Sequence, residues 1–188
     1  QYPGGVPKGS EPYWPVWLSG IPGSKTPALA ERFGTDFLRY MAFVPDAGVD
    51  FDVRKYDFDR DPPRLATMAR MYDATNPDLT AFRERGGKLL LFHGWADPLV
   101  TPQRTLEYFD AVRARMGGNE STAEFARLFM LPGVDHCGLQ AGPGAKSLEF
   151  DPLPALEAWV ERNEPPARLQ IRWQMNDGSV RSRDVQAQ

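Results

Sequence analysis

The sequence predicts an α/β fold built on parallel strands. Two apolar runs, residues 88–93 and 125–131, are continuous rather than alternating, as expected of strands that are covered on both faces. A helical pattern separates them, and a second one follows residue 151. The order strand, helix, strand, helix predicts parallel strands joined by a right-handed crossover. Because two strands are too few for a free-standing sheet of this kind, we expect the rest of the sheet to come from elsewhere.

Composition limits the class of protein and its partners. The 188 residues, 41% of them hydrophobic, are enough for one domain with a sizeable core. A net charge of −3 argues against nucleic acid and against an anionic membrane as partners. The sequence has no apolar run of about 18 residues, so it predicts no transmembrane helix. It starts without Met or a signal peptide, and we expect a cleaved or truncated product whose N-terminal portion is missing.

Residues 1–75 form an irregular region rich in proline and aromatic residues. Disordered segments are poor in aromatics, so we expect this region to be packed. Thr26-Pro27 predicts the start of a helix, with Thr26 as N-cap and Pro27 at the first helical position. The apolar face of this helix comprises Ala30, Phe33, Phe37, Tyr40, Met41 and Val44. Asp61-Pro62 predicts a second helix, with an inner face of Leu65, Met68 and Tyr72.

Residues 76–188 are more regular. Three helices are predicted to start at Asn76-Pro77, Thr101-Pro102 and Asp151-Pro152. Their inward residues are predicted to be Leu79 and Phe82 in the first, Leu106, Phe109, Val112 and Met116 in the second, and Leu153, Leu156, Trp159 and Val160 in the third. Residues 132–150 are predicted to be a glycine-rich loop. Asn176-Asp177-Gly178 between residues 169–174 and 179–183 predicts a terminal hairpin.

Asp97 and His136 follow the two predicted strands, on loops where α/β sheets carry their working groups. An imidazole base needs a carboxylate that fixes its tautomer and stabilises the imidazolium. The order Asp then His after consecutive strands is typical of the second half of a serine-hydrolase triad on an α/β-hydrolase sheet. The alternatives are that Asp97 forms a turn before Pro98 and that His136 bonds a backbone carbonyl.

No serine of this chain matches the nucleophile of such a triad. The serines occupy positions 10, 19, 24, 121, 147, 179 and 182, and none has glycine both two residues before and two after it. We therefore expect the nucleophile to lie outside the chain. His93 is expected to have a supporting or structural role, and Asp135 is the alternative partner for His136. The two histidines and one cysteine show no metal-ligand spacing.

At these residues the chain resembles the tannase and feruloyl esterase family. The matching segments are 86–98, 127–137, and 157–161 followed by Pro165-Pro166, and residues 7–11 with Trp14 and Trp17 resemble the family's lid region. The resemblance spans most of residues 1–168. It implies that residues 76–188 are the C-terminal part of an α/β-hydrolase core and that residues 1–75 are part of an irregular lid domain.

The resemblance also assigns roles. It implies that Asp97 is the triad acid, that His136 is the base, and that Cys137 pairs with a Cys just before a catalytic Ser outside this chain. The calcium site of the family's lid would lie upstream, so no cofactor is expected here. The implied substrate is an aromatic ester and the implied location is secreted or periplasmic. Aromatic lid residues could stack on a phenolic acyl group or form the lid's own core, and the candidates are Trp14, Trp17 and Phe43.

The sequence thus predicts a fragment of a serine carboxylic-ester hydrolase of the tannase and feruloyl esterase type. Alone it is expected to be inactive, since the nucleophile and the oxyanion hole are missing. The alternative is a non-catalytic module that binds an aromatic ligand or another protein.

Overall fold

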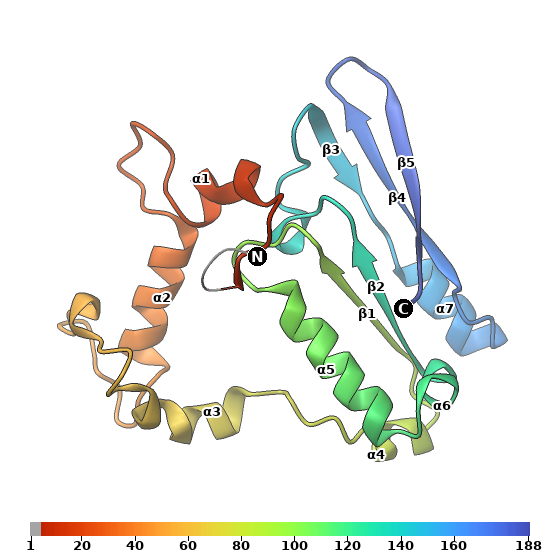
Figure 1. Cartoon of the computed structure of the whole chain (residues 1–188), viewed down its shortest axis with the longest axis horizontal. Helices are drawn as coiled ribbons and strands as arrows, with labels where there is room; N and C mark the ends of the chain where they lie inside the picture. Colours follow the sequence, from red (N-terminus) through yellow and green to blue (C-terminus); the bar gives the residue numbers. More distant parts are fainter. Residues whose placement is uncertain (1–4) are drawn as a thin grey trace. The chain divides into compact units, whose positions relative to one another are not determined.

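The computed structural model describes residues 5–188 and divides them into two compact units (Figure 1). One unit is Pro15–Thr75, and the other combines residues 5–14 with Asn76–Gln188. The lid region predicted over residues 1–75 stays a prediction, and in the structure residues 5–14 group with the larger unit. Tyr13 explains this grouping, because its buried side chain donates a hydrogen bond to the carbonyl oxygen of Gly133 in the larger unit. No helix within residues 5–188 combines the length and apolarity needed to span a bilayer.

Two parallel strands form the centre of the larger unit. Strands β1 (Leu89–Gly94) and β2 (Ala126–Leu131) pair in register, from Leu89 opposite Ala126 to Gly94 opposite Leu131. Helix α5 (Pro102–Arg115) connects them along the chain. The predicted strand–helix–strand unit is confirmed, and its parallel pairing places the carboxyl ends of both strands at one edge.

Strand β2 is buried on both faces, which explains its continuous apolar run. Its residues alternate between two clusters, since successive side chains of a strand point to opposite faces. Leu128 and Met130 pack in one cluster with Phe109 and Val112 of α5. The second cluster joins β2 to the other sheet and contains Phe129, Leu131, Leu169, Ile171 and Val185.

The second sheet has three antiparallel strands in the order β3-β4-β5. These are β3 (Ala145–Glu149), β4 (Arg168–Met175) and β5 (Val180–Gln186). The predicted hairpin is confirmed as β4–β5. The prediction of a loop throughout residues 132–150 is wrong, because β3 pairs with β4 through a ladder that a bulge interrupts between Ala145 and Ser147. An isolated bridge between Phe129 and Ala187 joins β2 to the end of the chain.

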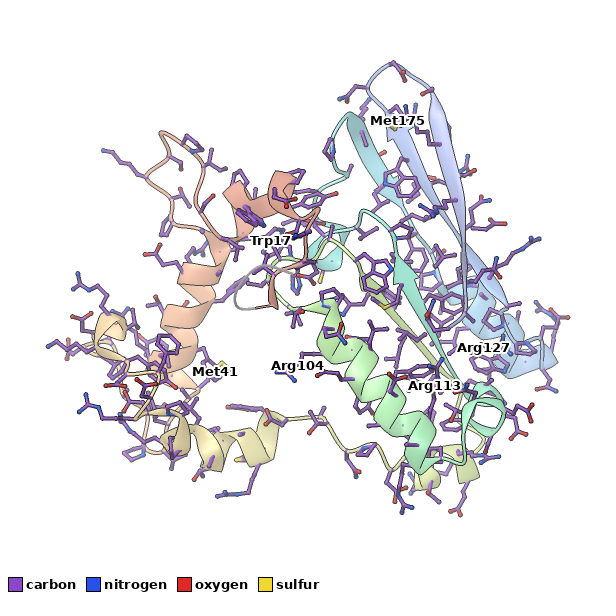
Figure 2. All side chains as sticks on the ribbon, viewed as in Figure 1. Trp17, Met41, Arg104, Arg113, Arg127 and Met175 are labelled. Atoms are coloured by element: carbon purple, nitrogen blue, oxygen red, sulfur yellow. The ribbon has the colours of Figure 1, made fainter. Side chains whose placement is uncertain are left out.

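The other helices of the larger unit are short, apart from α7. They are η2 (Glu11–Tyr13), α4 (Thr80–Glu84), α6 (Asn119–Ala123), η5 (His136–Gly138) and α7 (Leu153–Arg162). Helix α7 buries Trp159, with Lys88 Nζ 5.4 Å and Arg127 Cζ 5.6 Å from its ring (Arg127 is labelled in Figure 2). The prediction that Leu153, Val160 and Phe82 point inward is wrong, since all three are exposed.

The smaller unit is mostly loop around short helices. These are α1 (Trp14–Trp17), which begins at the unit boundary, α2 (Leu29–Tyr40), η3 (Val53–Lys55), η4 (Pro62–Leu65) and α3 (Ala66–Tyr72). The predicted start of α2 at Thr26-Pro27 is early, because the backbone of Ala28 is still extended and caps the helix. The apolar face of α2 is also exposed rather than buried, including Phe33, Phe37 and Tyr40.

Gly94, the last residue of β1, lets two backbones meet. A Cβ on Gly94 would lie 2.2 Å from the carbonyl oxygen of Val134 and 2.9 Å from that of Asp135. Because both oxygens belong to the backbone, a change of side-chain rotamer could not relieve the overlap. The loop after β1 and the loop after β2 therefore meet directly, and Ala96 N–H donates to Val134 O at 3.0 Å.

We expect Gly94→Ala to lower the free energy of unfolding by about 2 kcal/mol or more, because the added methyl group overlaps the backbone of Val134. Urea unfolding followed by circular dichroism measures this change. The control is Gly34→Ala in α2, where a Cβ meets nothing within 4 Å and the better helix propensity adds up to about 1 kcal/mol. Equal stability of Gly94→Ala and the unchanged chain would contradict the close approach.

Candidate active site

Asp97 is held by its own loop just after β1. Its carboxylate oxygen Oδ1 accepts the backbone N–H groups of Leu99 at 2.8 Å and Val100 at 2.9 Å. The residue is only 3% exposed. Asp97 is therefore a turn-forming aspartate, the alternative that the sequence left open, and this turn also fixes the orientation of its second oxygen.

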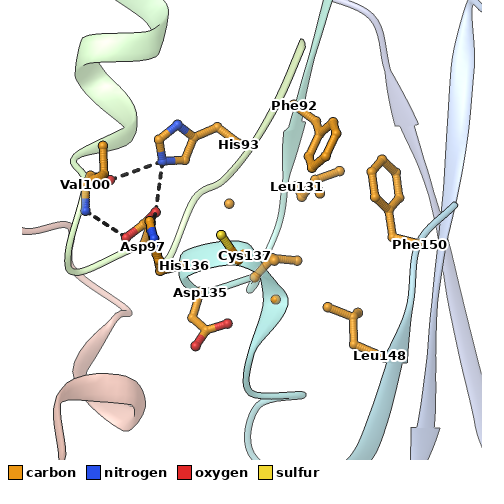
Figure 3. Close-up of a pocket in the computed structure, with 13 residues that line it drawn as sticks. Phe92, His93, Asp97, Val100, Leu131, Asp135, His136, Cys137, Leu148 and Phe150 are labelled. Carbon is orange, nitrogen blue, oxygen red and sulfur yellow. Dashed lines mark hydrogen bonds and ion pairs between the residues drawn. The ribbon is translucent and has the colours of Figure 1, made fainter. Parts of the chain in front are cut away.

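That second oxygen, Oδ2, meets two imidazole rings. His136 Nδ1 lies 2.8 Å from Oδ2, and His93 Nε2 lies 3.1 Å from it. Figure 3 shows His93, Asp97 and Val100 joined by these contacts, with His136 beside Asp97. The predicted meeting of Asp97 and His136 is thus present, and the carboxylate accepts from two backbone and two imidazole groups.

The hydrogen bond to Asp97 fixes which nitrogen of His136 carries a proton. An ionised carboxylate only accepts, so His136 Nδ1 must donate. The lone pair of the neutral ring is then on Nε2. This is the protonation pattern that a general base requires, with its acceptor nitrogen separate from the nitrogen that the carboxylate holds.

His93 adopts the opposite tautomer. Its Nε2 faces two acceptors, Asp97 Oδ2 and the carbonyl oxygen of Val100 at 3.1 Å, so Nε2 carries the proton. Its Nδ1 lies 2.7 Å from the hydroxyl of Thr105 on α5, which can donate to it. His93 therefore supports Asp97 from β1, and this arrangement agrees with the supporting role expected from its position at the strand end.

The hydrogen bonds around Asp97 keep it ionised despite its burial. Burial alone raises the pKa of this carboxyl. The hydrogen bonds from His93, from the Val100 N–H and from His136 outweigh burial and hold the pKa below its ordinary value of 3.8. A permanent negative charge therefore faces the His136 ring at neutral pH.

Asp135, the alternative partner of His136, is occupied within its own loop. Its oxygens accept from the backbone N–H and the side-chain amide of Gln140, each at 3.2 Å. Since Asp97 meets His136 Nδ1 directly, the geometry favours Asp97 over Asp135 as the orienting carboxylate.

A pocket of about 390 Å³ opens beside the Asp97–His136 pair. Its apolar wall comprises Phe92, Leu131, Val134, Leu148 and Phe150. The rings of Phe92 and Phe150 meet edge to face, with centroids 5.1 Å apart. None of the residues that line this pocket is a serine. No sequence pattern pointed to Leu148 or Phe150, because they lie in and beside β3, a strand that was not predicted.

Cys137 also lines this pocket, with its backbone in the left-handed region at φ 56°. It is an exposed free cysteine and the chain has no other, so the structure contains no disulfide. The pairing implied by the resemblance has no partner in this chain and stays a prediction.

The aromatic candidates for substrate stacking are mostly buried. Trp17 and Phe43 are each 4% exposed. Phe43 packs against Phe51 with ring centroids 5.7 Å apart, and the guanidinium of Arg64 lies 4.4 Å from its centroid. Trp14 donates from Nε1 to Ser10 Oγ at 2.9 Å. For Trp17 and Phe43 this burial favours the alternative that they form a core, while stacking stays a prediction.

The part of the chain that the structure describes contains no group of three or more His, Cys, Asp or Glu residues suited to hold a metal ion. Around Asp97 the reason is chemical. Both neighbouring imidazoles direct an N–H at the carboxylate, whereas a metal requires nitrogen lone pairs directed at one point.

The fold is of the α/β class, and a buried carboxylate meets an imidazole on loops past the carboxyl ends of two parallel strands, an arrangement that is also found in α/β hydrolases. The chain belongs to the tannase and feruloyl esterase family, whose sequence model, described as tannase and feruloyl esterase, matches residues 7–187. The family suggested by the resemblance is thereby confirmed.

Several relatives and solved structures are similar to the chain. An uncharacterized esterase of Xanthomonas campestris pv. campestris is 32% identical over 92% of this chain and 35% of the relative. Mono(2-hydroxyethyl) terephthalate hydrolase of Piscinibacter sakaiensis is 40% identical over 74% of this chain and 23% of the relative. The solved structure of tannin acyl hydrolase from Aspergillus niger superposes with a TM-score of 0.63 at 25% identity, covering 80% of this chain and 29% of that one. The chain thus spans about a quarter to a third of the length of these relatives.

We expect Asp97→Asn to lower the free energy of unfolding by about 2–3 kcal/mol at pH 7, because the negative charge is lost and the amide NH2 cannot accept the hydrogen bonds of the imidazoles. The folded pKa of Asp97 lies below 3.8, so its stabilising contribution is complete above pH 3.8 and is lost as the pH falls through the folded pKa. Urea unfolding of the unchanged chain and of Asp97→Asn between neutral and acidic pH measures this. The difference between their free energies of unfolding should shrink only below pH 3.8. A difference independent of pH would contradict the role of the charge.

Proposed function

We propose that the chain supplies the acid and base of a serine carboxylic-ester hydrolase that acts on aromatic esters. The nucleophilic serine would lie on a part of the protein outside these residues. The observation that carries the proposal is the 2.8 Å contact between His136 Nδ1 and Asp97 Oδ2, at the carboxyl ends of two parallel strands.

The proposed reaction is two-step acyl transfer. His136 Nε2 takes the proton of the serine hydroxyl as the oxygen attacks the ester carbonyl, and Asp97 stabilises the imidazolium that forms. The imidazolium then gives its proton to the leaving alcohol, which leaves an acyl-enzyme. Water, activated by the same nitrogen, releases the acid and regenerates the serine.

Two observations support an aromatic ester as substrate. Relatives of the chain are named tannase, probable feruloyl esterase and mono(2-hydroxyethyl) terephthalate hydrolase. The pocket beside His136 also has an apolar wall that includes Phe92 and Phe150, whose rings suit contact with an aromatic acyl group.

A secreted or periplasmic location belongs to the same proposal. The disulfide implied for Cys137 would require an oxidising compartment.

One observation favours the alternative of a non-catalytic binding module. Helix α2 exposes Phe33, Phe37 and Tyr40, which are spaced so that they share one face. Exposed aromatic faces of this kind mark contact sites for ligands or proteins. This alternative predicts binding without turnover.

A chimera tests the catalytic proposal. In it, this chain replaces the matching segment of mono(2-hydroxyethyl) terephthalate hydrolase, whose remaining part would supply the serine. We expect the chimera to hydrolyse aromatic esters such as methyl ferulate, and His136→Ala or Asp97→Asn to lower kcat by about 10⁴-fold. The matched control is Asp177→Asn in the β4–β5 turn, which should leave kcat unchanged.

The 188-residue chain alone should show no turnover above that of its His136→Ala variant. A folded chimera without activity, or one whose activity survives both substitutions, would contradict the assignment of Asp97 and His136.

A further inference from the structure

Four consecutive residues, the last of which is the proposed base His136, are each held by a different hydrogen bond. Gly133 O accepts from the Tyr13 hydroxyl at 2.5 Å, and Val134 O accepts from the Ala96 N–H at 3.0 Å. The carboxylate of Asp135 accepts from Gln140, and the ring of His136 donates to Asp97. Three of these contacts come from the two strand-end loops themselves. The first comes from a segment 120 residues earlier in the chain.

The side chain of Tyr13 contacts both ends of the loop that carries His136. Its side chain is 3% exposed, and its hydroxyl reaches Gly133 at the start of the loop. At the other end, a Cβ on Gly142 would lie 2.7 Å from the same hydroxyl oxygen. The loop that carries His136 therefore folds around the phenol of Tyr13.

The segment that carries Tyr13 is itself braced. The Ser10 hydroxyl donates to Pro7 O at 2.6 Å and accepts from the Trp14 indole at 2.9 Å, while the Tyr13 N–H donates to Ser10 O at 3.0 Å. Ser10 is completely buried. These bonds close residues 7–14 into a tight turn and leave the phenol little freedom to move.

The electrostatics keep the phenol as a donor. Burial and then the negative charge of Asp135 raise the pKa of Tyr13 above its ordinary value of 10.0. The hydroxyl therefore stays protonated throughout the neutral range, and its hydrogen bond to Gly133 persists wherever Asp97 is ionised.

We propose that Tyr13 is a positioning residue for His136. Through its hydroxyl it anchors the loop of residues 133–142, and this anchor keeps the His136 ring in the orientation that presents Nδ1 to Asp97. That this positioning serves catalysis rests on the proposed function, in which His136 is the base. The structural content of the proposal, the link between the Tyr13 hydroxyl and the tautomer of His136, does not depend on the serine or on any substrate.

The test uses the ring ¹⁵N spectra of the 188-residue chain, which has only two histidines. We expect Tyr13→Phe to raise the fraction of His136 in the Nε2–H tautomer about tenfold, the effect of losing roughly one hydrogen bond. The control is Tyr108→Phe, which removes a hydroxyl that donates to Asn76 O at 3.3 Å and should leave His136 unchanged.

A second variant pair perturbs the same contact without removing the hydroxyl. Gly142→Ala places a methyl group against the Tyr13 oxygen, whereas Gly144→Ala carries a similar positive-φ strain and meets only Met175, at 3.6 Å. We expect Gly142→Ala to shift the His136 tautomer and Gly144→Ala to leave it unchanged.

Backbone amide exchange in β4 is measured in all four variants and should stay unchanged. In the active chimera, Tyr13→Phe should lower kcat and leave KM unchanged. An unaltered His136 tautomer in both Tyr13→Phe and Gly142→Ala would overturn the proposal, and so would a loss of β4 protection in Tyr13→Phe. An inactive chimera with the expected tautomer shift would instead count against the proposed function alone.

Discussion

The carboxylate of Asp97 is the interaction on which the rest of the site depends. One oxygen is held by the backbone of its own loop, and the other by imidazoles from β1 and from the loop after β2. A buried charge with this many donors is stable, whereas the same charge without them would be costly. Because His93 and His136 share one oxygen, the position of each ring depends on the same carboxylate, and the tautomers of both follow from it.

The fold brings these groups together in two ways. Parallel pairing of β1 and β2 places their carboxyl ends at one edge, and the clusters on both faces of β2 keep that pairing rigid. The absence of a side chain at Gly94 then lets the two loops touch through their backbones. The loop that carries His136 is also held by Tyr13, whose hydroxyl donates to the carbonyl oxygen of Gly133. Backbone contacts between the two loops and the Tyr13 hydroxyl therefore add to the hydrogen bonds of Asp97 in positioning the site.

The success of sequence-based prediction varied along the chain for physical reasons. The strands β1 and β2, helix α5 and the β4–β5 hairpin were predictable, since continuous apolar runs and an Asn-Asp-Gly turn are local signals. The pairing of Asp97 with His136 followed, because parallel strands place their loops together. Strand β3 was not predictable, since its half-exposed residues become a strand only by pairing with β4. Helix α2 has the periodicity of a buried helix, yet Phe33 and Phe37 are exposed, because periodicity defines an apolar face and not what covers it. Tyr13 gave no signal at all, as its partner Gly133 is distant in sequence.

The central claim is that Asp97 holds His136 as the Nδ1–H tautomer, and ring ¹⁵N NMR of the unchanged chain tests it most directly. With only two histidines, both rings can be assigned by comparing the chain with a His93→Gln variant. The account predicts opposite tautomers at neutral pH, with the proton on Nδ1 in His136 and on Nε2 in His93. If His136 carries its proton on Nε2, or exchanges freely between both nitrogens, then Asp97 does not orient it and the proposed acid–base pair is not formed.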